Sequence, residues 1–215
     1  EIIETGEGEY HEEISVLHAI AKILRKKRFG KGAINFHSEE VKFKLDETGK
    51  PIETYIKEQK EANFLIEEFM LLANKKVAEF IGKVSARKTP RTFVYRVHDE
   101  PNPEKLNTFV QFLKKLGYTL NVSSRQSLAT SYNSLFEKIH GKGEENMIET
   151  IAVRTMAKAE YSTENIGHYG LAFPFYSHFT SPIRRYPDLM THRLLFQYLN
   201  GGKWIMFKMQ IKIEQ

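Results

Sequence analysis

Two prolines, Pro182 and Pro187, constrain the local fold of this chain more than any other feature. Proline lacks a backbone N–H and has a fixed φ, so it is tolerated best in a loop or in the first turn of a helix. Side chains then recur at helical spacing at Leu189, His192, Phe196 and Leu199. The sequence therefore predicts a loop around Ser181 and Pro182, followed by a helix that begins near Pro187.

Adjacent arginines, Arg184 and Arg185, fall at the junction between this loop and the helix. Free backbone N–H groups and the helix dipole favour an anion at the start of a helix, so a phosphate is the expected ligand there. The alternative is that both arginines pair with a neighbouring carboxylate, as surface arginines often do.

Strand patterns predict a small amount of β-structure. The run from Asn165 to Phe173 is short, apolar and aromatic, which is typical of a buried strand. Further strands are predicted at residues 33–36, 41–45, 52–57 and 93–97. A turn at residues 46–51 joins two of them, and we expect a small antiparallel sheet to form in this region.

Helical periodicity covers more of the chain. It predicts helices at residues 11–28, 60–83, 103–117, 124–139 and 145–159. Asn102 is expected to cap the third of these, with Pro103 at its first position. The basic residues 25–28 are interpreted as a solvated helix end, the alternative being a nucleic-acid patch. Together these patterns predict a mixed α+β fold, in which a small sheet packs with several helices.

Composition excludes several classes of protein. The chain has 215 residues, 41% hydrophobic and 27% charged, which suits a single globular domain. It has no cysteine, which excludes a disulfide framework and a thiolate zinc site. A net charge of +5 is compatible with a polyanionic partner but is also common in proteins without one. No apolar run reaches the roughly 18 residues of a membrane span, and we expect a cytoplasmic monomer without membrane contact.

A long motif resembles the signature of a known family of nucleases. The run from Asn165 to Arg193, and above all His178 to Leu189, resembles that of the ribonuclease R and ribonuclease II family, and is more similar to the ribonuclease R branch. Similarity of the same kind is found upstream at residues 32–36, 62–70 and 95–101. The resemblance covers residues 1–202, and residues 203–215 form an unrecognised tail with strand-like alternation.

This resemblance implies a fold and an activity. The chain would be the central and C-terminal part of an RNB-type catalytic domain. Its parent would be a processive 3'-to-5' exoribonuclease that hydrolyses single-stranded RNA to nucleoside 5'-monophosphates with Mg²⁺. Because the chain lacks an initiator Met and begins as if inside a helix, we expect it to be a fragment. Because it lacks the acidic metal cluster of the family, we expect this fragment to be inactive alone.

The family also implies roles for individual residues. Arg184 would be the catalytic arginine, neutralising charge on the scissile phosphate. Phe36 would stack on a base, the alternative being a core aromatic. Glu67 would accept a hydrogen bond from the ribose 2'-OH, the alternative being a solvent-facing carboxylate. Further RNA contacts would come from Arg185, Tyr186 and Arg193.

The acidic metal cluster of the family is missing from this sequence. Two-metal hydrolysis requires several carboxylates around the ions, and the aspartates of the chain are only Asp46, Asp99 and Asp188. We therefore expect Mg²⁺ to be bound by residues outside this chain. The histidines near the motif match no zinc spacing and are interpreted as structural. A second hypothesis follows, in which the chain belongs to a catalytically inactive relative or a fragment that only binds RNA.

Overall fold

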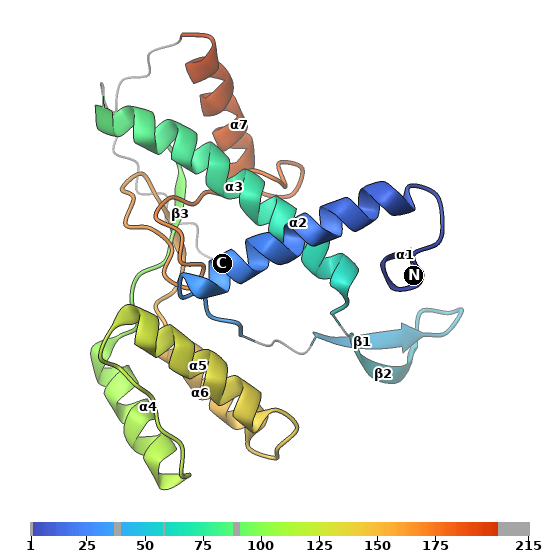
Figure 1. The fold of residues 1–215 in the computed structure, drawn as a ribbon, viewed down its shortest axis with the longest axis vertical. Coiled ribbons are helices and arrows are strands. Elements are labelled where there is room, and N and C mark those ends of the chain that lie inside the picture. Colours follow the sequence, from blue (N-terminus) through green and yellow to red (C-terminus); the bar gives the residue numbers. More distant parts are fainter. Residues whose placement is uncertain (1, 37–39, 58, 88–90, 202–215) are drawn as a thin grey trace.

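The computed structural model of the chain describes residues 2–36, 40–57, 59–87 and 91–201. It is a mixed α+β structure, as predicted (Figure 1). In chain order its elements are α1 (Ile2–Thr5), α2 (His11–Gly30), β1 (Glu40–Leu45), β2 (Pro51–Lys57), α3 (Glu61–Arg87), β3 (Tyr95–Val97), α4 (Pro103–Lys115), α5 (Arg125–Ile139), α6 (Glu145–Thr155), β4 (Glu160–Ser162) and α7 (Tyr186–Leu199). The strand-like tail predicted at residues 203–215 lies outside the described residues.

Helix boundaries agree well with the local sequence signals. The side chain of Asn102 accepts a hydrogen bond of 3.0 Å from the backbone N–H of Lys105, and Pro103 is the first residue of α4, as predicted. Pro187 lies in the first turn of α7. The helix predicted to reach residue 159 ends earlier, at Thr155, because Met156 is extended and directs the chain towards β4.

Two antiparallel pairs make up the β-structure of the described residues. β1 pairs with β2, and β3 pairs with β4 so that Arg96 lies opposite Tyr161. The predicted strand at 33–36 does not form. Asn133 on α5 occupies the backbone groups of this segment instead: its Oδ1 accepts from the N–H of Asn35 at 2.9 Å, and its Nδ2 donates to the carbonyl of Ala33 at 2.9 Å.

The stretch from Asn165 to Phe173 is a compact turn, so the prediction of a strand there was wrong. Gly167 and Ala172 both have positive φ, of 83° and 54°, which breaks any extended ladder. Backbone bonds close the turn on itself and on residue 98: the N–H of His168 donates to the carbonyl of Phe173 at 2.8 Å, and that of Tyr169 donates to the carbonyl of His98 at 2.8 Å.

Two hydrophobic clusters form most of the core. One lies among α4, α5 and α6, where Phe109, Tyr132 and Ile148 are almost fully buried. The other joins α3, β3 and α7 through Ile81, Phe93 and other apolar side chains. Figure 1 shows α4–α6 grouped at one end of the molecule and α3 with α7 at the other, with the 165–178 segment between them.

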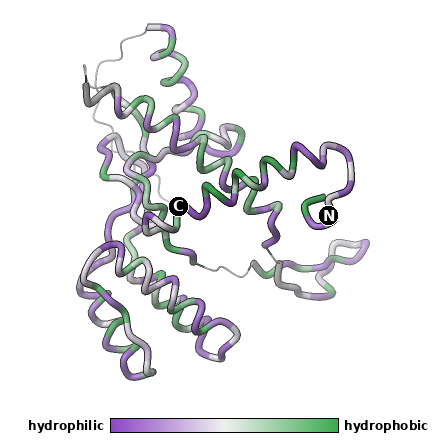
Figure 2. The backbone as a smooth tube through the Cα atoms, viewed as in Figure 1, coloured by the Kyte–Doolittle hydropathy of each residue, from purple (hydrophilic) through white to green (hydrophobic). Residues whose placement is uncertain are grey.

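Apolar residues recur along α2 and the β1–β2 hairpin (Figure 2), and several of their side chains are exposed. Examples that are more than half exposed are Val16, Ile23, Phe43 and Ile52. No helix in the described part of the chain combines the length and the hydropathy that a membrane crossing requires.

A buried ion pair links α2 to α3. Arg28 is only 6% exposed, which corrects the interpretation of residues 25–28 as a solvated helix end. Its Nε donates to Oε1 of Glu68 at 3.1 Å, and its Nη2 donates to Oε1 of Glu67 at 3.1 Å. Glu68 is 3% exposed, whereas the side chain of Glu67 is 42% exposed. Glu68 is therefore the carboxylate that compensates the buried guanidinium.

This difference predicts unequal effects of removing the two carboxylates. Glu68→Ala should lower the free energy of unfolding by about 3–5 kcal/mol, because it leaves Arg28 buried without its main partner. Glu67→Ala, the matched control, should cost less than about 1 kcal/mol, since that carboxylate is partly solvated. Urea unfolding at pH 7 measures both values. Equal losses in the two variants would contradict the assignment.

Candidate nucleic-acid site at the start of α7

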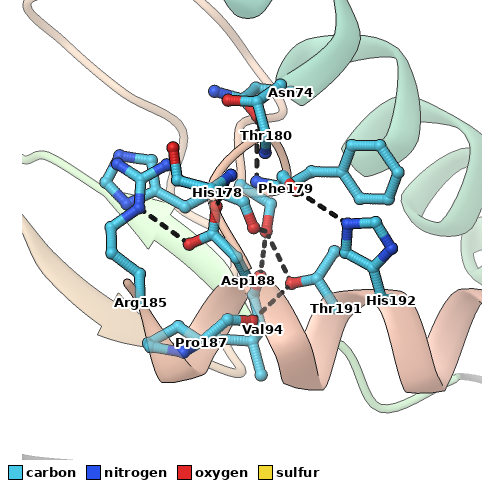
Figure 3. Close-up of polar contacts among 12 residues, drawn as sticks. Asn74, Val94, His178, Phe179, Thr180, Arg185, Pro187, Asp188, Thr191 and His192 are labelled. Carbon is cyan, nitrogen blue, oxygen red and sulfur yellow. Dashed lines mark hydrogen bonds and ion pairs between the residues drawn. The ribbon is translucent and has the colours of Figure 1, made fainter. Parts of the chain in front are cut away.

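Asp188 builds the loop that precedes α7. Its carboxylate is fully buried and lies in the first turn of the helix, where the helix dipole favours negative charge. Oδ1 accepts from the backbone N–H of Ser181 and from Nη2 of Arg185, both at 2.8 Å, and Oδ2 accepts from Nε of Arg185 at 2.9 Å (Figure 3). One side chain thus closes the loop and holds the arginine that ends it.

The two adjacent arginines differ in their partners. Arg185 forms the bidentate pair with Asp188, so the predicted alternative of carboxylate pairing holds for this residue. Arg184 is exposed, and within the described part of the chain its side chain has no ion pair or hydrogen bond. Tyr186, the first residue of α7, is 62% exposed. Arg184 is therefore a solvated cation at the start of a helix, available to an anion.

Asn74 ties the same loop to α3. This side chain is 3% exposed, and its Oδ1 accepts from the backbone N–H groups of Phe179 at 2.9 Å and of Thr180 at 3.2 Å. Its Nδ2 donates to the hydroxyl of Tyr176 at 3.2 Å. From α7, Nε2 of His192 donates to the carbonyl of Phe179 at 2.8 Å, and the two rings stack with centroids 4.0 Å apart. The loop is thus fixed from two helices (Figure 3).

Sequence reasoning missed Asn74, although a signal was present. The residue follows Leu71, Leu72 and Ala73 inside an otherwise apolar helical stretch. A buried amide in such a place needs hydrogen-bond partners from elsewhere in the chain. The signal indicates that partners exist but not that they are the backbone groups of a loop far along the sequence.

Glu67 and Arg185 line one cavity of about 480 Å³, together with Asn74 and Tyr176. The rest of its lining is largely apolar. Glu67 keeps an exposed carboxylate while bound to Arg28, so it is neither fully solvent-facing nor fully buried. The structure therefore places Glu67, the predicted ribose contact, beside Arg185, one of the three predicted arginines.

Phe36 lies in a different and larger groove, of about 1880 Å³. Part of its ring packs on the core, with centroids 6.3 Å from Tyr132 and 5.4 Å from Phe136. The side chain is only partly buried and lines the groove together with Arg96. Both predicted roles, core aromatic and base platform, are compatible with this position.

Arg193 is exposed on α7 and lines neither of these two cavities. Tyr186 is also absent from their linings. The structure brings Glu67 and Arg185 together, and it leaves Phe36 and Arg193 at separate places.

Two histidines beneath the site are held neutral. Burial, with the positive charges of Arg185, Arg96 and Arg184, lowers the pKa of His178 to about 4, although the carboxylate of Asp188 opposes this shift. Nδ1 of His178 is hydrogen bonded to the hydroxyl of Tyr161 at 2.7 Å. Burial and the neighbouring histidines lower the pKa of His168 to about 3. Within the described ranges no group of three or more His, Asp or Glu side chains is arranged to hold a metal ion.

The low pKa of His178 predicts that the protein loses stability in mild acid. The unfolded state takes up a proton near pH 6.5 that the folded state binds only near pH 4, so folding stability is complete above 6.5 and falls as the pH drops towards 4. In His178→Asn this fall, measured by urea unfolding at several pH values, should be smaller. Exposed His11→Asn should behave as the wild type. An identical fall in His178→Asn would contradict the assignment.

The chain matches a known protein family and is similar to several known proteins. The family model of the RNB domain matches residues 2–201 of the chain. A DIS3-like exonuclease 2 of Schizosaccharomyces pombe is 42% identical over 87% of the chain, and the ribonuclease R of Aquifex aeolicus is 37% identical over 88% of it. The structure of Mycoplasma genitalium RNase R in complex with ribose methylated single-stranded RNA superposes with a TM-score of 0.76 and 27% identity over 86% of the chain. The chain spans only 20%, 26% and 28% of the lengths of these three proteins.

Proposed function

The chain belongs to the RNB domain family, and on this premise we propose that the protein containing it hydrolyses single-stranded RNA from its 3' end. The products would be nucleoside 5'-monophosphates, and digestion would be processive. The observation that carries the proposal is Arg184, an exposed arginine without a carboxylate partner among the described residues, at the start of a helix whose loop is fixed by Asp188 and Asn74. The relative from Mycoplasma genitalium, solved with single-stranded RNA, supports RNA as the ligand.

Arg184 would act where negative charge develops on the scissile phosphate. A planar guanidinium can donate to two phosphate oxygens at once, and a fixed donor stabilises the transition state without reorganising. Arg185 is already bound by Asp188 and would therefore shape the loop and supply positive potential to the Glu67 cavity. Tyr186 and Arg193 would be outer contacts for RNA, because both are exposed along α7.

Glu67 and Phe36 would recognise RNA without reading its sequence. A carboxylate that accepts from a ribose 2'-OH distinguishes RNA from DNA, which lacks that donor. An aromatic ring in the large groove would stack on any base. Recognition of the ribose and stacking on any base fit a nuclease that moves along a strand of arbitrary sequence.

A divalent metal ion is the remaining requirement. Nucleases of the RNB family generally depend on divalent metals. We propose Mg²⁺ here, because this ion prefers oxygen ligands and can promote phosphodiester hydrolysis. The part of the chain that the structure describes has no suitable group of ligands. The carboxylates that hold Mg²⁺ would thus lie outside this chain, and the chain alone would be inactive.

An RNA-binding protein without catalysis is the second candidate. It is favoured by the lack of a metal-ligand group among the described residues and would use the same loop and groove. The cytoplasmic location and the monomeric state predicted from the sequence stay predictions.

Replacement of Arg184 distinguishes the two candidates. In the full-length protein, Arg184→Ala should lower the single-turnover rate of RNA cleavage at saturation by on the order of 10² or more, with a smaller effect on affinity measured without metal. Arg184→Lys should restore little, since a point charge does not reproduce the planar fork. Lys114→Ala, which removes an exposed cation on α4, should leave the rate unchanged. A normal saturating rate in Arg184→Ala would rule out the catalytic role.

Replacement of Glu67 tests the recognition of ribose. Glu67→Ala should reduce the preference for RNA over DNA of the same sequence by about tenfold, the value of one hydrogen bond to a charged acceptor. Glu67→Gln should be intermediate, because its amide oxygen still accepts but is uncharged. Binding to matched RNA and DNA oligonucleotides gives the ratio. A ratio equal to that of the wild type in both variants would remove Glu67 from the site.

A further inference from the structure

Arg96 lies at the centre of β3, which pairs with β4, and it lines the large groove that contains Phe36. Its guanidinium carbon is 4.6 Å from the centroid of the ring of Tyr161, the residue opposite Arg96 in the β3–β4 pair. The side chain is partly buried and forms part of the groove wall. This arginine was not among the predicted site residues.

The guanidinium of Arg96 is stacked but unpaired. Among the residues with a described position it has no ion pair and no side-chain hydrogen bond, although Asp99 and Glu100 follow on the same segment. An arginine that stacks through its face keeps the donors in its plane, and these remain able to bind an oxyanion. A partly buried cation without a carboxylate partner is unfavourable unless another anion binds it.

Three arginines act on His178, whose ring is linked to Arg96 through Tyr161. The hydroxyl of Tyr161 is hydrogen bonded to His178 at 2.7 Å, and Arg96, Arg184 and Arg185 all lie close enough to His178 to disfavour its protonation. The carboxylate that opposes them belongs to Asp188, which already binds Arg185 in bidentate fashion. Arg96 and Arg184 are thus the cations acting on His178 that have no carboxylate partner among the described residues.

We propose that Arg96 binds a backbone phosphate of single-stranded RNA that lies in the Phe36 groove. The inference rests on the proposed function and adds a phosphate contact to it. A groove of about 1880 Å³ is several times larger than the Glu67 cavity of about 480 Å³, and it combines an aromatic ring with a cation, as grooves for single strands do. Arg96 would hold the strand while Phe36 supports a base.

The test is the affinity of the full-length protein for a single-stranded RNA oligonucleotide, measured without divalent metal at several salt concentrations. Arg96→Gln should bind on the order of tenfold more weakly at 0.1 M salt, and its log–log salt dependence should be shallower by about 0.7. Arg96→Lys should restore the salt dependence, because the charge returns, but only part of the affinity. Lys138→Gln, an equal loss of charge on the exposed side of α5, should bind as the wild type.

Thermal unfolding of each variant separates binding from folding. If Arg96→Gln binds RNA with normal affinity and salt dependence, Arg96 is only a structural partner of Tyr161 and the inference is overturned, whatever its unfolding temperature. If Arg96→Lys is folded but no better than Arg96→Gln in salt dependence, the phosphate contact is also excluded. If the wild type itself does not bind single-stranded RNA, the proposed function fails rather than the role of Arg96 within it.

Discussion

The buried carboxylate of Asp188 is the constraint on which the candidate site depends. A charge removed from water is tolerated only when charged and polar donors surround it. Asp188 receives three such bonds, from the Ser181 backbone and from two nitrogens of Arg185, and it lies in the first turn of α7. Satisfying this one group fixes the conformation of the loop from Ser181 to Arg185, which precedes α7. It also engages Arg185 in an ion pair, whereas the neighbouring Arg184 remains exposed.

The loop is connected to the rest of the fold by polar contacts rather than by a large apolar interface. Asn74 of α3 holds two backbone N–H groups, and His192 of α7 holds the carbonyl of the same segment. Because Glu67 lies on α3 as well, the carboxylate proposed to bind ribose and Arg184, the arginine proposed to bind the scissile phosphate, are held by the same helix and loop. Such a fixed arrangement favours catalysis, which requires donors positioned before the reaction begins.

Local signals in the sequence predicted the helices and their starts better than the β-structure. Proline and N-cap preferences act within a few residues, so Asn102 and Pro187 were informative alone. The 33–36 segment could not be predicted, because its hydrogen bonds go to the side chain of Asn133, on a distant helix. The strand predicted at 165–173 failed because Ala172 adopts a positive φ that its residue type does not announce.

In the site too, local sequence signals identified residues, while contacts with distant residues could not be predicted. The motif pointed to both arginines, but only the structure separates Arg185, bound to a carboxylate, from Arg184, which is exposed. The burial of Arg28 depends on its ion pair with Glu68, which lies on another helix. The periodicity of α2 alone therefore could not predict it. Arg96 was placed on a strand by its pattern, yet its stacking on Tyr161 and its position in the groove depend on how β3 and β4 pair.

The most direct test of this account is product analysis with the full-length wild-type protein and Mg²⁺. A 5'-end-labelled single-stranded RNA should shorten from its 3' end to a small labelled remnant. The released material should be nucleoside 5'-monophosphates, while the DNA of the same sequence stays intact. RNA that is bound but remains full length would show a binding protein, and internal cleavage or products that carry a 3'-phosphate would show a different chemistry. Either of these results would contradict the account.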